Sequence, residues 1–223
     1  MSNIEVPVDG PGIDPYTKAL ESIYCVGQNY LRHIQELQNK IPDAPVIFTK
    51  PVSAVSFSDT DLEFPVEKGA VHHEVELVFL LGKTGRHIDK RDAWDYVEAY
   101  SVGIDFTLRD LQTDLREKGL PWLLSKGFDH SAALADFIAF SDPNALEDIR
   151  FWLDLNGKRR QEGTPDDMVF DVPTILAFLS RTITLREGDL LFTGTPAGVG
   201  SVKSGDEVTI GIEGTLEETF HIA

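Results

Sequence analysis

The sequence contains very little cysteine: Cys25 is the only one in 223 residues. A single cysteine excludes any disulfide within the chain. Cys25 lies in the apolar stretch Ile23–Val26, and no candidate base stands near it in the sequence. We therefore interpret it as a small buried hydrophobic side chain rather than as a reactive thiol.

Long apolar runs are also missing. No run approaches the roughly 20 residues that a membrane-spanning helix needs. The first residues, MSNIEVPVDG, lack both the basic region and the apolar core of a signal peptide. We therefore expect a cytoplasmic protein without a membrane segment.

Basic residues are scarce, with 20 Lys and Arg against 37 Asp and Glu and a formal net charge of −17. Such a surface repels phosphate backbones and anionic lipids, so we expect neither a nucleic-acid partner nor a membrane partner. An anionic substrate would need some of these few basic side chains to gather at its binding site.

What the sequence does contain indicates a strand-rich globular protein. Hydrophobic residues make up 42% of the chain and charged residues 26%, as is usual for a protein with a core. The 18 Gly and 12 Pro are spread along the chain and predict many turns. No internal repeat or domain boundary is evident. We expect a mixed α+β, β-rich fold with a polar lead-in over residues 1–19 and one domain over residues 20–223.

Periodicity and turn residues predict the individual elements. Helices are expected over residues 30–40, 89–100, 108–118 and 173–180, with Asn29 and Asp89 as caps of the first two. Strands are expected over residues 22–26, 46–49, 75–81, 101–106, 151–155, 189–193 and 207–212. The Asn156-Gly157 pair predicts a hairpin turn.

The sharpest local feature is a pair of carboxylates at the start of the strand predicted over residues 75–81. Glu74 and Glu76 point to the same side because side chains alternate along a strand. The strand itself is apolar on both faces, which is typical of a buried strand. Two carboxylates held close together need a cation or a proton between them, and Mg²⁺ suits such ligands. The alternative is an exposed strand start with no ligand.

A third carboxylate, Asp105, stands at the predicted junction of a strand and a helix, where functional residues concentrate. The alternative is that Asp105 caps the helix. On that helix Arg109 and Gln112 share a face at a spacing of three residues. Arg109 could hold a substrate carboxylate in a bidentate pair, or a neighbouring acid in an ordinary ion pair.

Two further patterns point to chemistry. His33 and Glu36 are three residues apart on a predicted helix, and a carboxylate beside an imidazole makes a better general base. A surface pair is the alternative. The glycine-rich stretch of residues 191–200 lacks a Walker lysine, so it is no phosphate loop of that type. Its backbone N–H groups could approach an anion, or the loop could be an ordinary tight connection.

Taken in order along the chain, these motifs resemble the fumarylacetoacetate hydrolase family, most closely its short, single-domain acylpyruvase-type members. The matching motifs span roughly residues 20–223 and are Gly27-Gln28-Asn29-Tyr30 with His33 and Glu36, Lys50-Pro51, His73-Glu74-x-Glu76, Gly103-x-Asp105 with Arg109-Asp110-Leu111-Gln112, Lys126-Gly127-Phe128-Asp129, and Gly194-Thr195-Pro196-x-Gly198-Val199-Gly200.

The resemblance implies a fold, a metal and a set of site residues. The fold would be the mixed β-sandwich roll of the family's C-terminal domain, usually as a homodimer. Glu74, Glu76 and Asp105 match the metal ligands, with Mg²⁺ (magnesium) the usual ion and Mn²⁺ or Ca²⁺ the alternatives. Lys126 matches a lysine near the metal. Substrate-contacting positions match Arg109, Gln112, Thr195 and the adjacent Gly194, and a catalytic dyad matches His33 and Glu36.

The implied function is metal-dependent hydrolysis of a carbon–carbon bond in a small anionic 2-oxo acid. An acylpyruvate would give pyruvate and a carboxylate, and the same site could decarboxylate oxaloacetate. One alternative is an isomerase or decarboxylase acting on a 2-hydroxyhepta-2,4-diene-1,7-dioate type of diacid. Members that only isomerise can lack the dyad, so His33 and Glu36 favour a hydrolase or lyase. A non-catalytic, metal-stabilised binding module is the remote alternative.

The chain departs from the family pattern at two positions. Ile104 stands where many relatives have Asn, directly before Asp105, and Gly127 stands where Ser or Thr is frequent. These differences bear on the hydrogen bonds around the implied metal ligands.

Overall fold

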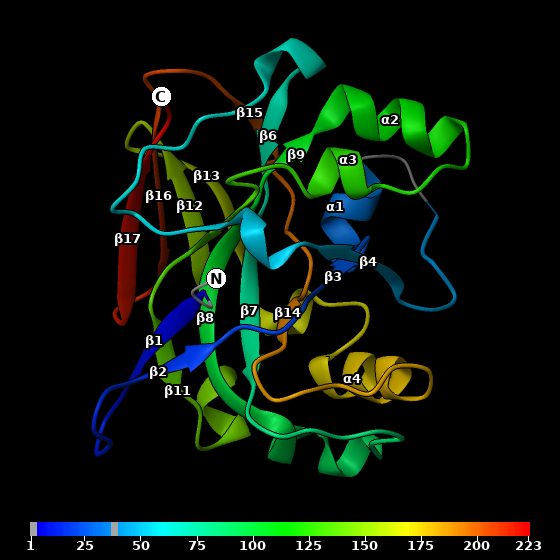
Figure 1. Ribbon diagram of the computed structural model, residues 1–223, viewed down its shortest axis with the longest axis vertical. Coiled ribbons are helices and arrows are strands. Elements are labelled where there is room, and N and C mark those ends of the chain that lie inside the picture. The colour runs from blue at the N-terminus through cyan, green and yellow to red at the C-terminus, as the bar shows by residue number, and fades with distance from the viewer. Residues whose placement is uncertain (1–3, 37–39) are drawn as a thin grey trace.

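Strands dominate the fold, which is mixed α+β with a curled main sheet. The structure, a computed structural model, describes residues 4–36 and 40–223. Figure 1 shows the long strands β7 and β8 running through the middle of the molecule, with α1, α2 and α3 together near one end of them and α4 near the other.

The strands form three sheets among the described residues. The main sheet holds β1 (Glu5–Asp9), β2 (Tyr16–Ala19), β3 (Ile23–Gly27), β4 (Val46–Lys50), β5 (Val55–Ser56), β7 (Val75–Leu81), β8 (Val97–Asp105), β10 (Ala132–Leu134), β11 (Phe137–Ala139) and β14 (Leu190–Phe192). The second holds β12 (Phe151–Leu155), β13 (Lys158–Gly163), β16 (Glu207–Ile212) and β17 (Leu216–His221). The third holds β6 (Val71–His73), β9 (Thr107–Leu108) and β15 (Gly200–Val202).

The helices are short and lie between strands. They are α1 (Leu31–Glu36), α2 (Arg109–Glu117), α3 (Leu123–Lys126) and α4 (Val172–Ser180). Short 3₁₀ segments cover Val52–Ala54, Val66–Lys68, Lys90–Tyr96, Pro143–Leu146 and Pro165–Asp167. The helix predicted at residues 173–180 and the hairpin at Asn156-Gly157 are confirmed, because α4 and the β12–β13 pair occupy those places.

The order of strands in the main sheet differs from their order in the chain. The path runs β2-β1-β11-β8-β7-β14-β3-β4. Strand β14 therefore lies between β3 and β7, parallel to the first and antiparallel to the second. The β7–β8 ladder forms the centre of this sheet. It runs from Val75 opposite Ile104 to Leu81 opposite Val97.

Strand β7 is buried on both faces, as its apolar run predicts. Leu77 and Phe79 belong to one hydrophobic cluster, which includes the side chains of the second sheet. Val78 and Leu80 belong to a second cluster on the opposite face. A strand enclosed in this way holds Glu76, and Glu74 directly before it, in a rigid position.

Two predicted elements differ in the structure. The helix predicted over residues 89–100 is wrong beyond its first turns: Lys90–Tyr96 is a 3₁₀ segment, and residues 97–100 already belong to β8. Asp89 does cap this segment, accepting a hydrogen bond from the Arg91 N–H. Pairing with β7 across the whole ladder outweighs the local helical spacing. The predicted lead-in also holds two strands, β1 and β2, at the edge of the main sheet.

The first helix begins at Leu31 and is described to Glu36, whereas the prediction ran from residue 30 to 40. Residues 37–39 lie outside the described residues, and Lys40 is not helical. Asn29 does not cap this helix, so that prediction is wrong. Its side-chain amide instead bonds Thr193 O (2.8 Å) and both backbone groups of Phe170. Asn29 thus ties the start of α1 to the end of β14.

Candidate metal and substrate site

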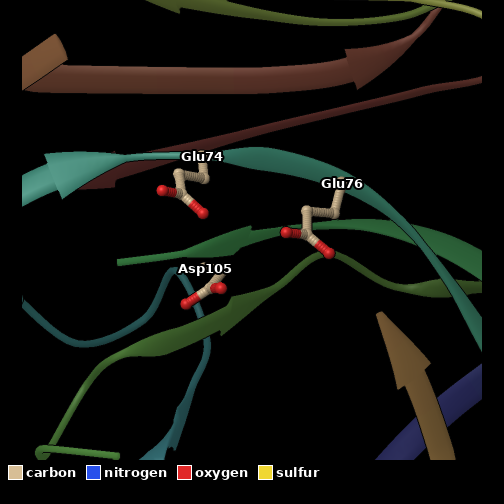
Figure 2. A group of neighbouring side chains, drawn as sticks. All are labelled: Glu74, Glu76 and Asp105. Atoms are coloured by element: carbon tan, nitrogen blue, oxygen red, sulfur yellow. The ribbon is translucent and has the colours of Figure 1, made fainter. Parts of the chain in front are cut away.

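Three carboxylates converge at one end of the β7–β8 ladder. Glu74 lies between β6 and β7, Glu76 lies in β7, and Asp105 ends β8. The Asp105 N–H donates to the Glu74 carbonyl over 2.8 Å, which brings the two residues side by side. Figure 2 shows the three carboxylates turned toward a common space. One oxygen from each lies within 4.8 Å of the others, and all three side chains are buried.

This arrangement decides two alternatives that the sequence left open. Glu74 and Glu76 are not an exposed strand start, because they are 5% and 1% exposed. Asp105 does not cap α2, whose N-cap is Leu108. The carboxylate instead faces the two glutamates.

Two buried lysines contact the triad. Lys126, at the end of α3, places its Nζ 2.8 Å from Glu74 Oε2 and 2.6 Å from Asp105 Oδ2. It also donates to Thr107 Oγ1 over 2.6 Å. Lys50, at the end of β4, places its Nζ 2.7 Å from Asp105 Oδ1. Asp105 is therefore held by a cation on each side.

Arg109 and Gln112 share a face of α2, as predicted. The Arg109 guanidinium donates to Gln112 Oε1 over 2.6 Å and pairs with Glu74 Oε1. Of the two roles considered for Arg109, the structure therefore contains the ion pair with a neighbouring acid. That acid belongs to the triad, so Arg109 orients a carboxylate of the site.

The charges around the three acids are uneven. Burial alone would raise the pKa of Glu74, but Lys126 and Arg109 outweigh it and hold that pKa well below its usual range. Burial raises the pKa of Glu76 well above its usual value, and the charges of Asp105 and Glu74 add to the effect. Among the described residues, Glu76 accepts a hydrogen bond from the Gly194 N–H, over 2.7 Å, and from no side chain. Glu76 is the acid whose charge lacks a cation.

The donor set fits a divalent metal ion. Carboxylate oxygens are ligands of hard cations such as Mg²⁺, Mn²⁺ and Ca²⁺. A buried carboxylate without a cation is costly, and an ion held between the three acids would neutralise Glu76. We therefore assign Glu74, Glu76 and Asp105 as a candidate site for a divalent metal.

A pocket of about 700 Å³, measured out to its open mouth, leads to the triad. Its apolar wall consists of Val26, Phe48 and Trp122. The predicted site residues His33, Glu74, Glu76, Asp105, Arg109, Gln112, Lys126 and Thr195 all line it, and so does Arg116. In a chain with net charge −17, the gathering of two arginines and a lysine in one pocket suits an anionic ligand.

His33 and Glu36 form a contact on α1. His33 is 5% exposed, and its Nδ1 lies 3.3 Å from Glu36 Oε2. Glu36 also accepts the Gly198 N–H, at 3.2 Å from Oε2. This pair is therefore no isolated surface pair, because His33 faces the pocket and Glu36 joins α1 to the glycine-rich loop.

The glycine-rich loop binds carboxylates of the protein itself. Gly194 donates to Glu76 and Gly198 donates to Glu36. Gly194 has φ +96°, and a Cβ there would lie 2.9 Å from the Asn29 Cβ. Glycine is required at this position, since another residue would be strained and would push Asn29 away. The two N–H groups thus connect the loop to the triad and to α1.

Sequence reasoning did not assign roles to Lys50 and Gln161. Lys50 belongs to the Lys50-Pro51 motif, and its signal was a charged residue closing an apolar strand. Gln161 lies in β13 among exposed Lys and Arg residues, so no local pattern distinguishes it. It is nevertheless buried, and it hydrogen-bonds Thr195.

The two departures from the family pattern occupy tight places. Ile104 is fully buried in β8, opposite Val75 and Ala133. It therefore adds an apolar side chain directly before Asp105. At Gly127 a Cβ would lie 2.7 Å from Pro51 Cδ and 2.8 Å from Leu123 Cδ1, so a larger residue would require the neighbouring side chains to shift.

The fold and the site together define a class of protein: a strand-rich α+β chain whose buried carboxylate triad opens into a pocket lined by basic side chains. None of the helices in the described ranges has the length and apolar character to span a membrane. The profile of the fumarylacetoacetate (FAA) hydrolase C-terminal family matches residues 22–221. This chain belongs to the fumarylacetoacetate hydrolase family.

Two relatives and one solved structure show how similar this chain is to known proteins. The mitochondrial oxaloacetate tautomerase of Mus musculus is 42% identical over 205 residues, covering 91% of each chain. The mitochondrial oxaloacetate decarboxylase of Dictyostelium discoideum is 42% identical over 193 residues, covering 86% of this chain and 88% of that one. The crystal structure of fumarylpyruvate hydrolase from Pseudomonas aeruginosa, in complex with Mn²⁺ and pyruvate, has a TM-score of 0.91 and 35% identity, covering 100% of this chain and 97% of that one.

Proposed function

We propose that this chain is a metal-dependent enzyme that hydrolyses a carbon–carbon bond of an acylpyruvate, releasing pyruvate and a carboxylate. The observation that carries the proposal is one pocket lined by the carboxylate triad and by His33, whose imidazole is paired with Glu36. A protein that only binds a metal needs no such base. The 35% identical relative named as a fumarylpyruvate hydrolase supports this reaction class.

Glu74, Glu76 and Asp105 would hold the metal, with Mg²⁺ as the proposed ion and Mn²⁺ or Ca²⁺ as alternatives. When bound, a divalent ion supplies Lewis acidity for the 2-oxo acid group of the substrate. Arg109 and Lys126 keep Glu74 ionised, because both cations contact its carboxylate and lower its pKa. The protein thus presents a charged ligand in a buried place.

His33 is the proposed general base. The Glu36 carboxylate next to Nδ1 keeps the ring proton on that nitrogen, which leaves Nε2 to accept a proton from water. The water oxygen adds to the acyl carbon C4, and the bond between C3 and C4 breaks. Its electron pair stays with the pyruvate fragment, C3 takes up a proton, and C4 leaves as the carboxylate.

Basic and polar side chains in the pocket would hold the substrate. Lys126 and Arg109 offset the negative charge that develops on the pyruvate fragment. Gln112 and Thr195 offer hydrogen bonds, and Gly194 orients the loop that carries Thr195. The three carboxylates and three cations of the pocket balance one another, so a bound divalent ion would give it the net positive charge that suits a small anionic 2-oxo acid.

A second candidate is chemistry on oxaloacetate, by decarboxylation or tautomerisation. It is favoured by the two 42% identical relatives, whose names are oxaloacetate tautomerase and oxaloacetate decarboxylase. Neither reaction adds water, so neither requires His33 to activate one. Isomerisation of a dienoic diacid of the 2-hydroxyhepta-2,4-diene-1,7-dioate type is the remaining alternative with the same ligands.

The deciding experiment follows the ultraviolet absorbance of acetylpyruvate with Mg²⁺ and again with EDTA. We expect absorbance to fall only with metal, with pyruvate as product. Parallel assays follow oxaloacetate, by its keto–enol absorbance change and by release of CO₂. Turnover of oxaloacetate without any turnover of acetylpyruvate would replace the hydrolase proposal by the second candidate.

We further propose that the protein acts as a homodimer, as the family resemblance implies, and that it is cytoplasmic. Size-exclusion chromatography with light scattering tests the assembly. A mass of twice 24.8 kDa is expected, and a monomer would exclude the dimer.

A further inference from the structure

The side chain of Gln161 connects three parts of the site. It lies in β13 of the second sheet and is 1% exposed, while most of that strand is exposed. Its Oε1 is 2.8 Å from His73 Nδ1 and accepts the Val75 N–H over 3.1 Å. Its Nε2 donates to Thr195 Oγ1 over 2.7 Å and to the Pro196 carbonyl over 2.9 Å. The amide therefore uses its full hydrogen-bonding capacity in a buried place.

The orientation of this amide is fixed by its backbone partners. The Val75 N–H can only donate, so the oxygen of Gln161 must face it. The Pro196 carbonyl can only accept, so the nitrogen must face that side. Flipping the amide would break both bonds. His73 consequently carries its proton on Nδ1 and donates it to Gln161.

The fixed orientation determines the direction of the Thr195 hydroxyl. Because Thr195 Oγ1 accepts a hydrogen from Gln161, its own proton points elsewhere. Thr195 is 3% exposed and lines the pocket beside the triad. Its hydroxyl is thereby made a donor, which is the role that an oxygen of an anionic ligand requires.

We propose that Gln161 is a positioning residue, which presents the Thr195 hydroxyl as a hydrogen-bond donor to a carboxylate or oxo oxygen of the bound 2-oxo acid. The same amide holds the Val75 N–H, which lies between Glu74 and Glu76 in the chain. One side chain thus sets the spacing between the triad and the Thr195 donor. The inference rests on the proposed function for its ligand class but requires no turnover.

A double-mutant cycle tests the proposal by ligand binding. The probe is oxalate, a dianion with the oxygens of a 2-oxo acid, titrated calorimetrically into protein saturated with Mn²⁺. The variants are Gln161→Met, Thr195→Val and the double substitution, with Thr195→Ser as the conservative variant. Glu162→Gln, at the exposed neighbour in β13, is the matched control.

We expect Thr195→Val to weaken oxalate binding by about tenfold or more, because a hydrogen bond to a charged group is lost. Gln161→Met should weaken oxalate binding by a similar factor. The double variant should bind oxalate as tightly as the weaker-binding single variant, because both substitutions remove the same interaction with the Thr195 hydroxyl. Thr195→Ser keeps the hydroxyl and should recover most of the affinity that Thr195→Val loses, whereas Glu162→Gln should bind like the wild type. A purely structural role for Gln161 predicts a lower Tm with losses that add in the double variant.

Unchanged oxalate binding in Gln161→Met, additive losses, or no oxalate binding by the wild type would each overturn the proposal. Failure to hydrolyse acetylpyruvate would not, since binding is the readout. If Gln161→Met does not fold, neutron diffraction from the wild-type oxalate complex answers the question. The deuteron on Thr195 Oγ1 should point to oxalate, and a deuteron pointing to Gln161 would contradict the assignment.

Discussion

The ammonium nitrogen of Lys50 lies 2.7 Å from Asp105 Oδ1, and neither side chain has any exposed surface. The same nitrogen donates to the carbonyls of Ser131 (2.9 Å) and Phe106 (3.4 Å) and to the carbonyl of Lys126. One buried cation therefore joins a triad carboxylate to the backbone that carries the second lysine. Lys50 neutralises Asp105 while leaving its other oxygen facing Lys126.

The first prediction concerns Lys50→Met. Removing the cation leaves Asp105 and the surrounding carbonyls buried without this partner, so the free energy of unfolding should fall by about 3–5 kcal/mol. Urea denaturation measures it, and Lys158→Met, at an exposed position of β13, is the control. A loss below about 1 kcal/mol, within the range of an exposed ion pair, would show that Lys50 is not needed to compensate Asp105.

The second prediction concerns the metal and Glu76. In Glu76→Gln the amide carries no charge, so the metal-free protein should be at least as stable as the wild type at pH 8, where the raised pKa makes the charged acid costly. Mn²⁺ at 100 times its Kd should add about 2.7 kcal/mol to the wild type and little to the variant. Thermal unfolding with Mn²⁺ and with EDTA measures both effects. Equal stabilisation of the two proteins by Mn²⁺ would remove Glu76 from the ligand set.

The third prediction separates hydrolysis from metal binding. His33→Ala should lower kcat for acetylpyruvate by about 100-fold or more, the usual contribution of a general base. Glu36→Gln should act in the same direction with a smaller effect, because Gly198 and His33 keep an oxygen partner. Stabilisation by Mn²⁺ should stay as in the wild type. Full hydrolysis by His33→Ala would disprove the base assignment.

The fourth prediction concerns pH and Asp189, in the turn before β14. Burial raises the pKa of this carboxyl to about 6 from 3.8. The folded state then binds the proton more tightly than the unfolded state, so this group lowers stability as pH rises from about 4 to about 6, and the full penalty remains above that. Asp189→Asn removes the penalty.

The Asp189→Asn variant should equal the wild type at pH 4 and exceed it at pH 8 by about 1–2 kcal/mol, after allowance for solvent screening. The amide oxygen can still accept the Arg186 N–H, which the carboxylate accepts over 2.7 Å. Urea denaturation at the two pH values measures the difference. A constant difference between the proteins at both pH values would show that Asp189 does not titrate in this window.

The elements with strong local patterns were predictable from the sequence. The sequence predicts that strand β7 is buried, because every residue from Val75 to Leu81 except Glu76 is apolar. Alternation along that strand also placed Glu74 and Glu76 on one side. Helix α4 has an Asp cap and a Pro at its start, and both signals are local. These features depend on neighbours within a few residues.

Features that depend on distant partners were not predictable in this way. The local sequence predicts helix at the start of β8, because the pairing of that segment with β7 involves residues outside any local window. Strand β1 contains Pro7, which argues against a strand, and the sequence does not predict it. The strand lies between β2 and β11, and its register with β11 involves Val8 and Asp9, beyond Pro7. Asp105 and Lys126 were placed at the site through the family resemblance, and Gln161 was not placed at all, because its partners are 34 to 88 residues away.

The position of β14 has a consequence for how the chain is made. Residues 190–192 must insert between β3 and β7, both of which leave the ribosome much earlier. At usual translation rates the two older strands wait on the order of ten seconds with their inner edges unpaired. An unfinished chain therefore exposes unpaired strand edges that are prone to aggregation, and chaperones that shield nascent chains should bind it. Gly194 and Thr195 come shortly after β14 in the chain, so the candidate site can be complete only after the last strand of the main sheet is synthesised.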